Sequence, residues 1–166
     1  MEEYQVRYKC GVGRTGRMLI ARLLPGTDLV GGITKLCAAH DIEAGVVTSV
    51  MGTLREATIY TAGPRPDLRA GIGYSEPILV VGPIEFITGQ GLLSMEDNGK
   101  LFVHLHGLIS DLQMKVYGGH FFPGGNPVLS TIDVAVTETL GVKVPRVFDP
   151  ETELALNAPY TVQVAK

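Results

Sequence analysis

The sequence has few cysteines and no excess of positive charge. Cys10 and Cys37 are its only cysteines, too few for a disulfide framework and not spaced like a zinc knuckle or a CxxC redox motif. Lysine and arginine total 14 against 17 aspartates and glutamates, so no basic field favours contact with a nucleic-acid backbone. The composition therefore predicts two free thiols and argues against direct DNA binding.

Long apolar runs are also absent. No stretch of eighteen consecutive apolar residues occurs, and Met1–Lys9 carries four charges without an apolar run of signal-peptide length. These absences predict a cytoplasmic protein that does not contact a membrane. At 166 residues, of which 45% are hydrophobic, the chain is long enough to bury a core, and we expect one domain over residues 1–166.

One amphipathic helix and many strands are expected. Leu29, Ile33 and Cys37 recur at helical spacing, and Thr27 or Asp28 can cap the helix that they define. Alternating or apolar runs predict strands at 4–10, 18–24, 45–51, 54–62, 84–93, 100–109, 114–122 and 128–138. This pattern indicates the α+β class, a compact domain in which a largely antiparallel, mixed sheet packs around one main helix.

Three of the four histidines fall within seventeen residues. His104 and His106 alternate on a predicted strand and share one face about 6.6 Å apart, a span that two imidazoles can close around zinc. With His120 they would leave a fourth position open for water or substrate, as in catalytic zinc sites. The three residues therefore predict a site for zinc or another divalent metal. The alternative is that these three histidines form a polar pocket in which they are hydrogen-bonded. The fourth histidine, His40, is assigned a capping or surface role at the end of the predicted helix.

A polar turn at 110–113 predicts a hairpin that brings the third histidine back to the first two. If the loop has an odd number of residues centred on Leu112, His120 lies opposite His104. An even loop breaks this geometry unless a bulge at Gly118 or Gly119 restores it.

A glycine pattern near the start of the chain resembles a nucleotide-binding motif. Gly11, Gly13 and Gly16 satisfy GxGxxG, which in a dinucleotide-binding unit precedes a helix. Pro25 follows only nine residues after Gly16, and the segment between them has no helical stripe. No nucleotide cofactor is assigned.

Several segments together resemble the plant and prokaryote conserved domain, abbreviated PPC. They are Arg22–Leu29, Gly52–Ala57, Gly82–Ile87, His104–His106 and Gly118–His120. The resemblance covers roughly residues 16–139 and leaves 140–166 as a C-terminal extension. It implies a sheet packed around the helix and assembly as a homotrimer.

The resemblance also bears on DNA and on metal. Plant relatives carry an Arg-Gly-Arg-Pro hook for the minor groove of AT-rich DNA, whereas Pro64–Asp67 lacks the flanking glycine and arginine. The same fold class resembles acetolactate decarboxylase, in which an HxH strand and a later histidine hold zinc. His104, His106 and His120 match that arrangement.

Two functions are compatible with these features. As a zinc-dependent lyase or hydrolase acting on a small oxo or hydroxy acid, the protein would use Arg22 to clamp the anion and Glu56 and Glu85 as candidate proton-transfer acids. Arg22 interrupts an apolar run and is interpreted as a charge within a buried strand, which needs a partner to offset its desolvation. Its alternative role is therefore an ion pair with either glutamate. The alternative for each glutamate is that it simply faces solvent on its strand and has no catalytic role. As a non-enzymatic trimeric binding or regulatory module, the protein would present its loops or cleft to a partner and reach DNA only through that partner.

Overall fold

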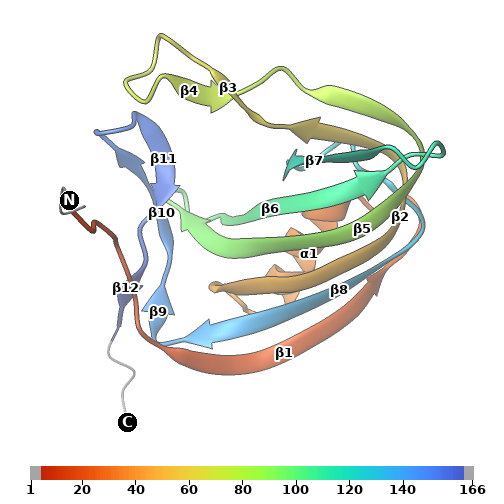
Figure 1. Cartoon of the computed structure of the whole chain (residues 1–166). Coiled ribbons are helices and arrows are strands. Elements are labelled where there is room, and N and C mark those ends of the chain that lie inside the picture. Colours follow the sequence, from red (N-terminus) through yellow and green to blue (C-terminus); the bar gives the residue numbers. More distant parts are fainter. Residues whose placement is uncertain (1–4, 163–166) are drawn as a thin grey trace.

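A long curved sheet, one helix and several short strands make up the part of the chain that the structure describes. The computed structural model describes residues 5–162. The strand predicted at 4–10 is wrong over residues 5–10, which belong to no strand, and its first residue lies outside the described range. In chain order the elements are β1 (Arg14–Leu23), α1 (Leu29–Ala39), β2 (Gly45–Tyr60), β3 (Ala62–Pro64), β4 (Ile72–Tyr74), β5 (Ile78–Glu96), β6 (Leu101–Ser110), β7 (Val116–Phe121), β8 (Val128–Leu140), β9 (Val142–Lys143), β10 (Pro145–Asp149), β11 (Leu154–Asn157) and β12 (Tyr160–Thr161). Figure 1 shows the sheet curving around α1, which confirms the predicted α+β class with one main helix.

The main sheet is mixed and closes partly on itself. Its strand order is β1-β8-β2-β7-β6-β5-β10-β11, and β2 also pairs with β5. Adjacent strands of this sheet run antiparallel, with the single exception of the pair β10 and β5, which is parallel. At its far end β2 pairs with β7, at Ile59 with Phe121 and at Tyr60 with His120. This pairing completes the circuit β2-β5-β6-β7 and brings the end of β2 beside the third histidine.

The helix α1 forms where the sequence predicts it. Its N-cap is Asp28, whose Oδ1 accepts a hydrogen bond of 2.8 Å from the backbone N–H of Gly31, so the cap falls on the second of the two expected residues. The apolar stripe of α1 is buried against the sheet, while His40 is exposed at the C-cap as predicted. Within residues 5–162, no helix combines the length and apolar character needed to cross a membrane.

The strand β2 is continuous where the sequence predicts two strands. Its pairing with β8 shifts register between Gly52 and Leu54, and Gly52 has a φ of +142°. A Cβ at Gly52 would lie 2.1 Å from the carbonyl oxygen of Thr131. Only glycine fits this position, so the Gly52-Thr53 pair marks a distortion within one strand rather than its end.

The strand β1 lies at the edge of the sheet and is largely exposed. Met18 and Ile20 expose 65% and 76% of their surface. Arg22 is also exposed and lies opposite Asp133 of β8. The interpretation of Arg22 as a charge within a buried strand is therefore wrong, because no other part of residues 5–162 covers this side chain.

The hydrophobic core lies between α1 and the inner face of the sheet. Alternate residues of β6 enter it, namely Val103, Leu105 and Ile109. Because successive side chains of a strand point to opposite faces, His104 and His106 project from the outer face. The core packing of one side of β6 thus fixes the orientation of the histidines on the other.

Candidate metal centre

Two neighbouring strands carry the three histidines. His104 and His106 come from β6 and His120 from β7, next to Phe121, which is fully buried in the core. The three side chains form a cluster in which one ring nitrogen from each residue lies within 4.8 Å of the others. The structure therefore brings together all three residues of the predicted metal site.

The register of the β6–β7 hairpin differs from the predicted one. His120 pairs with His106, not with His104, and Ser110 pairs with Val116 as the last pair before the turn. The loop has an odd number of residues, as expected, but it is centred on Gln113 rather than Leu112. A shift of the turn centre by one residue moves each partner by two, so all three side chains stay on one face. No bulge at the glycines is needed.

The spacing of the ring nitrogens suits a small divalent ion. Nε2 of His104 lies 3.0 Å from Nε2 of His106, which lies 3.2 Å from Nδ1 of His120. Nitrogen ligands at about 2.0 to 2.1 Å from a tetrahedral zinc ion would be about 3.3 Å apart. Among residues 5–162 no hydrogen-bond partner reaches the buried Nε2 of His120. These two separations are close to that value, and the three candidate ligand atoms all lie within 4.8 Å of one another, so the cluster suits a divalent metal. The same two separations are also hydrogen-bond distances, as in the alternative of a polar histidine pocket.

Burial and nearby positive charge favour the neutral forms of His104 and His120. The pKa of His120 is lowered to about 3, first by desolvation and then by the positive charges of His104, His106 and Arg146. The pKa of His104 is also lowered, by desolvation first and then by His106 and Arg146. Neutral imidazoles offer the lone pairs that a metal requires. The site is therefore prepared for a cation near neutral pH.

Acidification should destabilise the metal-free protein. His120 titrates near pH 6.5 in an unfolded chain but has a pKa of about 3 in the folded one, so between these values the unfolded state binds more protons. The stabilisation is complete above pH 6.5 and is lost as the pH falls. We expect the free energy of unfolding to drop by about 2 kcal/mol between pH 7 and pH 5 through this residue. Urea denaturation in the presence of a chelator measures the drop. In a His120→Asn variant the drop should be smaller by that amount, and an equal drop in both proteins would contradict the assignment.

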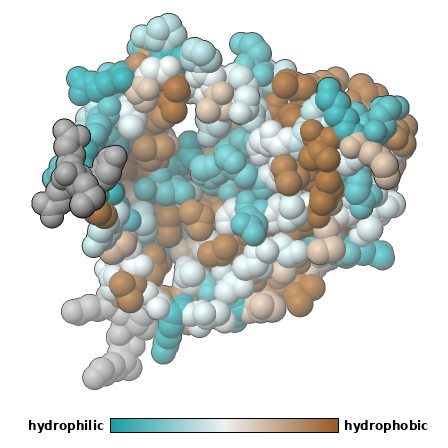
Figure 2. Space-filling view, viewed as in Figure 1, coloured by the Kyte–Doolittle hydropathy of each residue, from teal (hydrophilic) through white to brown (hydrophobic). Residues whose placement is uncertain are grey.

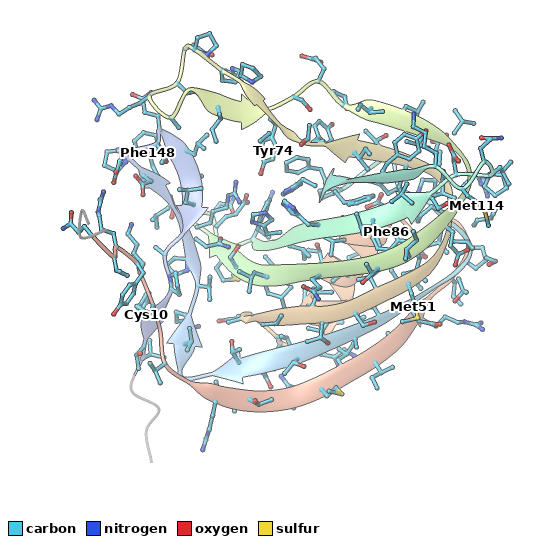
Figure 3. The ribbon with its side chains drawn as sticks, viewed as in Figure 1. Cys10, Met51, Tyr74, Phe86, Met114 and Phe148 are labelled. Atoms are coloured by element: carbon cyan, nitrogen blue, oxygen red, sulfur yellow. The ribbon has the colours of Figure 1, made fainter. Side chains whose placement is uncertain are left out.

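The histidines line a cavity of about 390 Å³. One wall comes from the end of β2 and from β3 and β4, and the opposite wall comes from β10 and β11. Figure 2 shows a hollow here with hydrophilic side chains at its floor. In Figure 3 Tyr74 points from β4 towards the floor, and its ring centroid lies 5.0 Å from that of His120. With Phe122, 4.1 Å from the His120 ring, this tyrosine shields the third histidine, which is only 1% exposed.

The three residues predicted to act in catalysis lie outside this cavity. None of Arg22, Glu56 and Glu85 is among its lining residues. Arg22 and Glu85 are exposed on β1 and β5, and Glu56 is half-buried on β2. Within residues 5–162 Arg22 forms no ion pair with either glutamate. Their catalytic role stays a prediction.

Sequence reasoning missed Arg146 and the aromatic wall. Arg146 lies in the C-terminal extension, on β10, and lines the cavity. Tyr60 and Tyr74 line it from the opposite side. No local pattern marks these residues, because a single arginine in a proline-containing tail is typical of exposed surface. Only the parallel pairing of β10 with β5 places Arg146 beside the histidines.

The fold and the site define a small α+β protein with a candidate metal centre on the outer face of its sheet. The chain belongs to the Plants and Prokaryotes Conserved (PCC) domain family, whose model matches residues 11–140. The match confirms the family expected from the sequence. The segment after residue 140, which includes Arg146, lies beyond the matched residues.

Solved structures share this fold over almost their whole length. A metal-containing protein from Archaeoglobus fulgidus is 29% identical with a TM-score of 0.77, covering 90% of this chain and 99% of the other. A plant- and prokaryote-conserved (PPC) protein from Pyrococcus horikoshii is 24% identical with a TM-score of 0.72, covering 94% and 98%. The second likeness supports the fold alone.

Curated relatives match as part of a longer protein. The bifunctional protein GlmU of two Synechococcus strains is 29% identical over 136 residues and 28% identical over 131 residues. These matches cover 82% and 79% of this chain but 19% and 18% of the relatives. The chain thus spans about a fifth of the length of the curated relatives it matches.

Proposed function

We propose that the protein binds zinc through His104, His106 and His120 and acts as a lyase or hydrolase on a small oxo or hydroxy acid. The observation that carries this proposal is the three-histidine cluster, with one ring nitrogen from each residue within 4.8 Å of the others. The metal-containing protein of A. fulgidus, which shares this fold and 29% of its aligned residues, supports the choice of a metal.

The donor set favours a catalytic over a structural metal. Three histidine ligands leave one tetrahedral position open, and the cluster lies at a cavity rather than in the core. When bound, a divalent ion at such a site polarises a carbonyl or carboxylate oxygen. The histidines hold the ion, and Tyr74 and Phe122 keep water from His120.

The same proposal includes assembly as a homotrimer. Large apolar side chains are exposed on the outer surface, among them Ile20 of β1, Val81 of β5 and Met114 at the β6–β7 turn. Figure 2 shows apolar side chains gathered at the end of the molecule where Figure 3 labels Met114. Surface of this kind favours association, and a closed ring of three chains would cover it symmetrically. Because Arg22, Glu56 and Glu85 do not line the cavity of their own chain, the trimer would bring them to the metal of a neighbouring chain.

Metal analysis of the untagged protein tests the proposal. Purified without chelator, the wild-type protein should contain close to one zinc ion per chain by plasma mass spectrometry. The His104→Ala, His106→Ala double variant should contain almost none, because one remaining imidazole cannot hold the ion. Light scattering on the same samples should give the mass of three chains for both proteins.

His40 provides the matched control for this measurement. It is the one histidine outside the cluster and is exposed at the end of α1, so His40→Ala should keep the full metal content. Wild-type protein without metal would overturn the centre and favour the binding-module function. Equal metal in the wild-type and double-variant proteins would place the ion elsewhere. Where metal is bound, a screen of small oxo and hydroxy acids should give turnover that His106→Ala abolishes.

A further inference from the structure

We infer that Arg146 binds the carboxylate of a small organic acid whose other oxygen lies at the metal position, so that the C-terminal segment completes the site. The inference rests on the proposed metal centre and names its ligand class. It assigns anion binding to a residue beyond the family match at 11–140. The main evidence is that Arg146 and all three histidines line the same cavity.

Arg146 is held in place without an ionic partner. Its guanidinium carbon lies 4.0 Å from the centroid of the Phe102 ring, on the strand that carries His104 two residues later. Stacking on an aromatic face fixes the plane of a guanidinium and leaves its N–H edges free. Within residues 5–162 no carboxylate forms an ion pair with it, and Glu96, its register neighbour on β5, is instead bonded to Asn98.

The charge balance of the cavity calls for an anion. Its described lining contains Arg146 and the histidines but no aspartate or glutamate. A half-buried guanidinium and a divalent cation in one cavity repel each other unless negative charge lies between them. The lining that this chain provides supplies none, and an anionic ligand would provide it. A carboxylate matches the fork of the guanidinium in two parallel hydrogen bonds.

The remaining walls limit the rest of the ligand. Ile72, Leu154 and Leu156 also line the cavity and would pack against a short hydrocarbon part. A volume of about 390 Å³ is near the lower end of ligand sites. The chemistry therefore fits a short-chain 2-oxo or 2-hydroxy acid, with its carboxylate towards Arg146 and its oxo or hydroxy oxygen towards the histidines.

Cobalt-substituted protein tests this inference by absorption spectroscopy. Titration with 2-oxobutanoate at pH 7.5 should change the visible cobalt bands of the wild-type protein, whereas 2-butanone, which lacks the carboxylate, should cause little change at equal concentration. Arg146→Gln should raise the Kd for 2-oxobutanoate about 10- to 100-fold, the range expected for loss of a charge-assisted bidentate pair. Arg146→Lys should give a smaller rise, because it keeps the charge but not the fork.

The controls separate this inference from the metal centre itself. Arg14→Gln, which removes the charge of an exposed arginine outside the cavity, should leave the Kd unchanged. Arg146→Gln should retain the cobalt bands without ligand, which shows that the site is folded and loaded. If the wild-type and Arg146→Gln proteins both show cobalt bands and have the same Kd for 2-oxobutanoate, the role of Arg146 alone is overturned. If the cobalt-loaded wild-type protein does not bind 2-oxobutanoate, the ligand class is overturned. Absence of cobalt bands in the wild-type protein would overturn the metal centre and this inference with it.

Discussion

Zinc should raise the thermal midpoint of the metal-free protein by about 5–10 °C. A ligand that binds only the folded state stabilises it by about 2.7 kcal/mol at 100 times its Kd, and each kcal/mol moves the midpoint of a chain of this size by about 2–4 °C. The folded chain holds nitrogens of His104, His106 and His120 within 4.8 Å of one another. The unfolded chain does not, so binding to it is weaker. Calorimetry with and without zinc measures the shift.

Two variants decide whether the shift arises at this cluster. The His104→Ala, His106→Ala protein should show no shift at the same zinc concentration, and the His40→Ala protein should show the full one. A shift of equal size in the double variant would contradict the assignment. Circular dichroism of the double variant without metal confirms that the comparison is made between folded proteins.

Truncating Phe86 should be the most damaging single change in the core. Phe86 is fully buried, with its ring centroid 5.1 Å from that of Phe121. A Cβ added at Gly107 would lie 2.5 Å from its ring, so the ring packs directly against β6 beside His106. Phe86→Ala should lower the free energy of unfolding by about 3–5 kcal/mol, since it leaves a large cavity. Urea denaturation of the metal-free protein measures the loss.

A second phenylalanine gives the matched control. Phe148 is 65% exposed on β10, so Phe148→Ala should change the free energy of unfolding by no more than about 0.5 kcal/mol. Phe86→Ala should also weaken zinc binding, because Phe86 supports both β6, next to His106, and β7, where Phe121 adjoins His120. A loss below about 1 kcal/mol would show that the neighbouring side chains close the cavity.

Local pattern was sufficient for several features of the site. The alternation around Val103 and Leu105 predicted that His104 and His106 share one face of a strand, and in the structure they do. The spacing of Leu29, Ile33 and Cys37 predicted α1, including its capping region. These predictions succeeded because side-chain period and capping depend on neighbours within a few residues.

Predictions that depended on the surroundings of a strand were less accurate. Arg22 interrupts apolar residues, which indicated burial, but β1 is an edge strand and exposes it. Gly52 indicated a break, but β8 approaches so closely there that glycine is needed within a continuous β2. In each case the sequence pattern of one strand could not reveal which strand would lie beside it.

By itself the sequence determined the class of the fold, the family, the helix and the identity of the three candidate metal ligands, since all of these follow from periodicity and from short motifs. Tertiary structure decided that His120 pairs with His106, that Tyr74 covers His120 and that Arg146 enters the same cavity. The turn centre sets the first of these, and chain segments far apart in sequence set the others. Pairings between such segments depend on packing over the whole sheet, which no local pattern encodes.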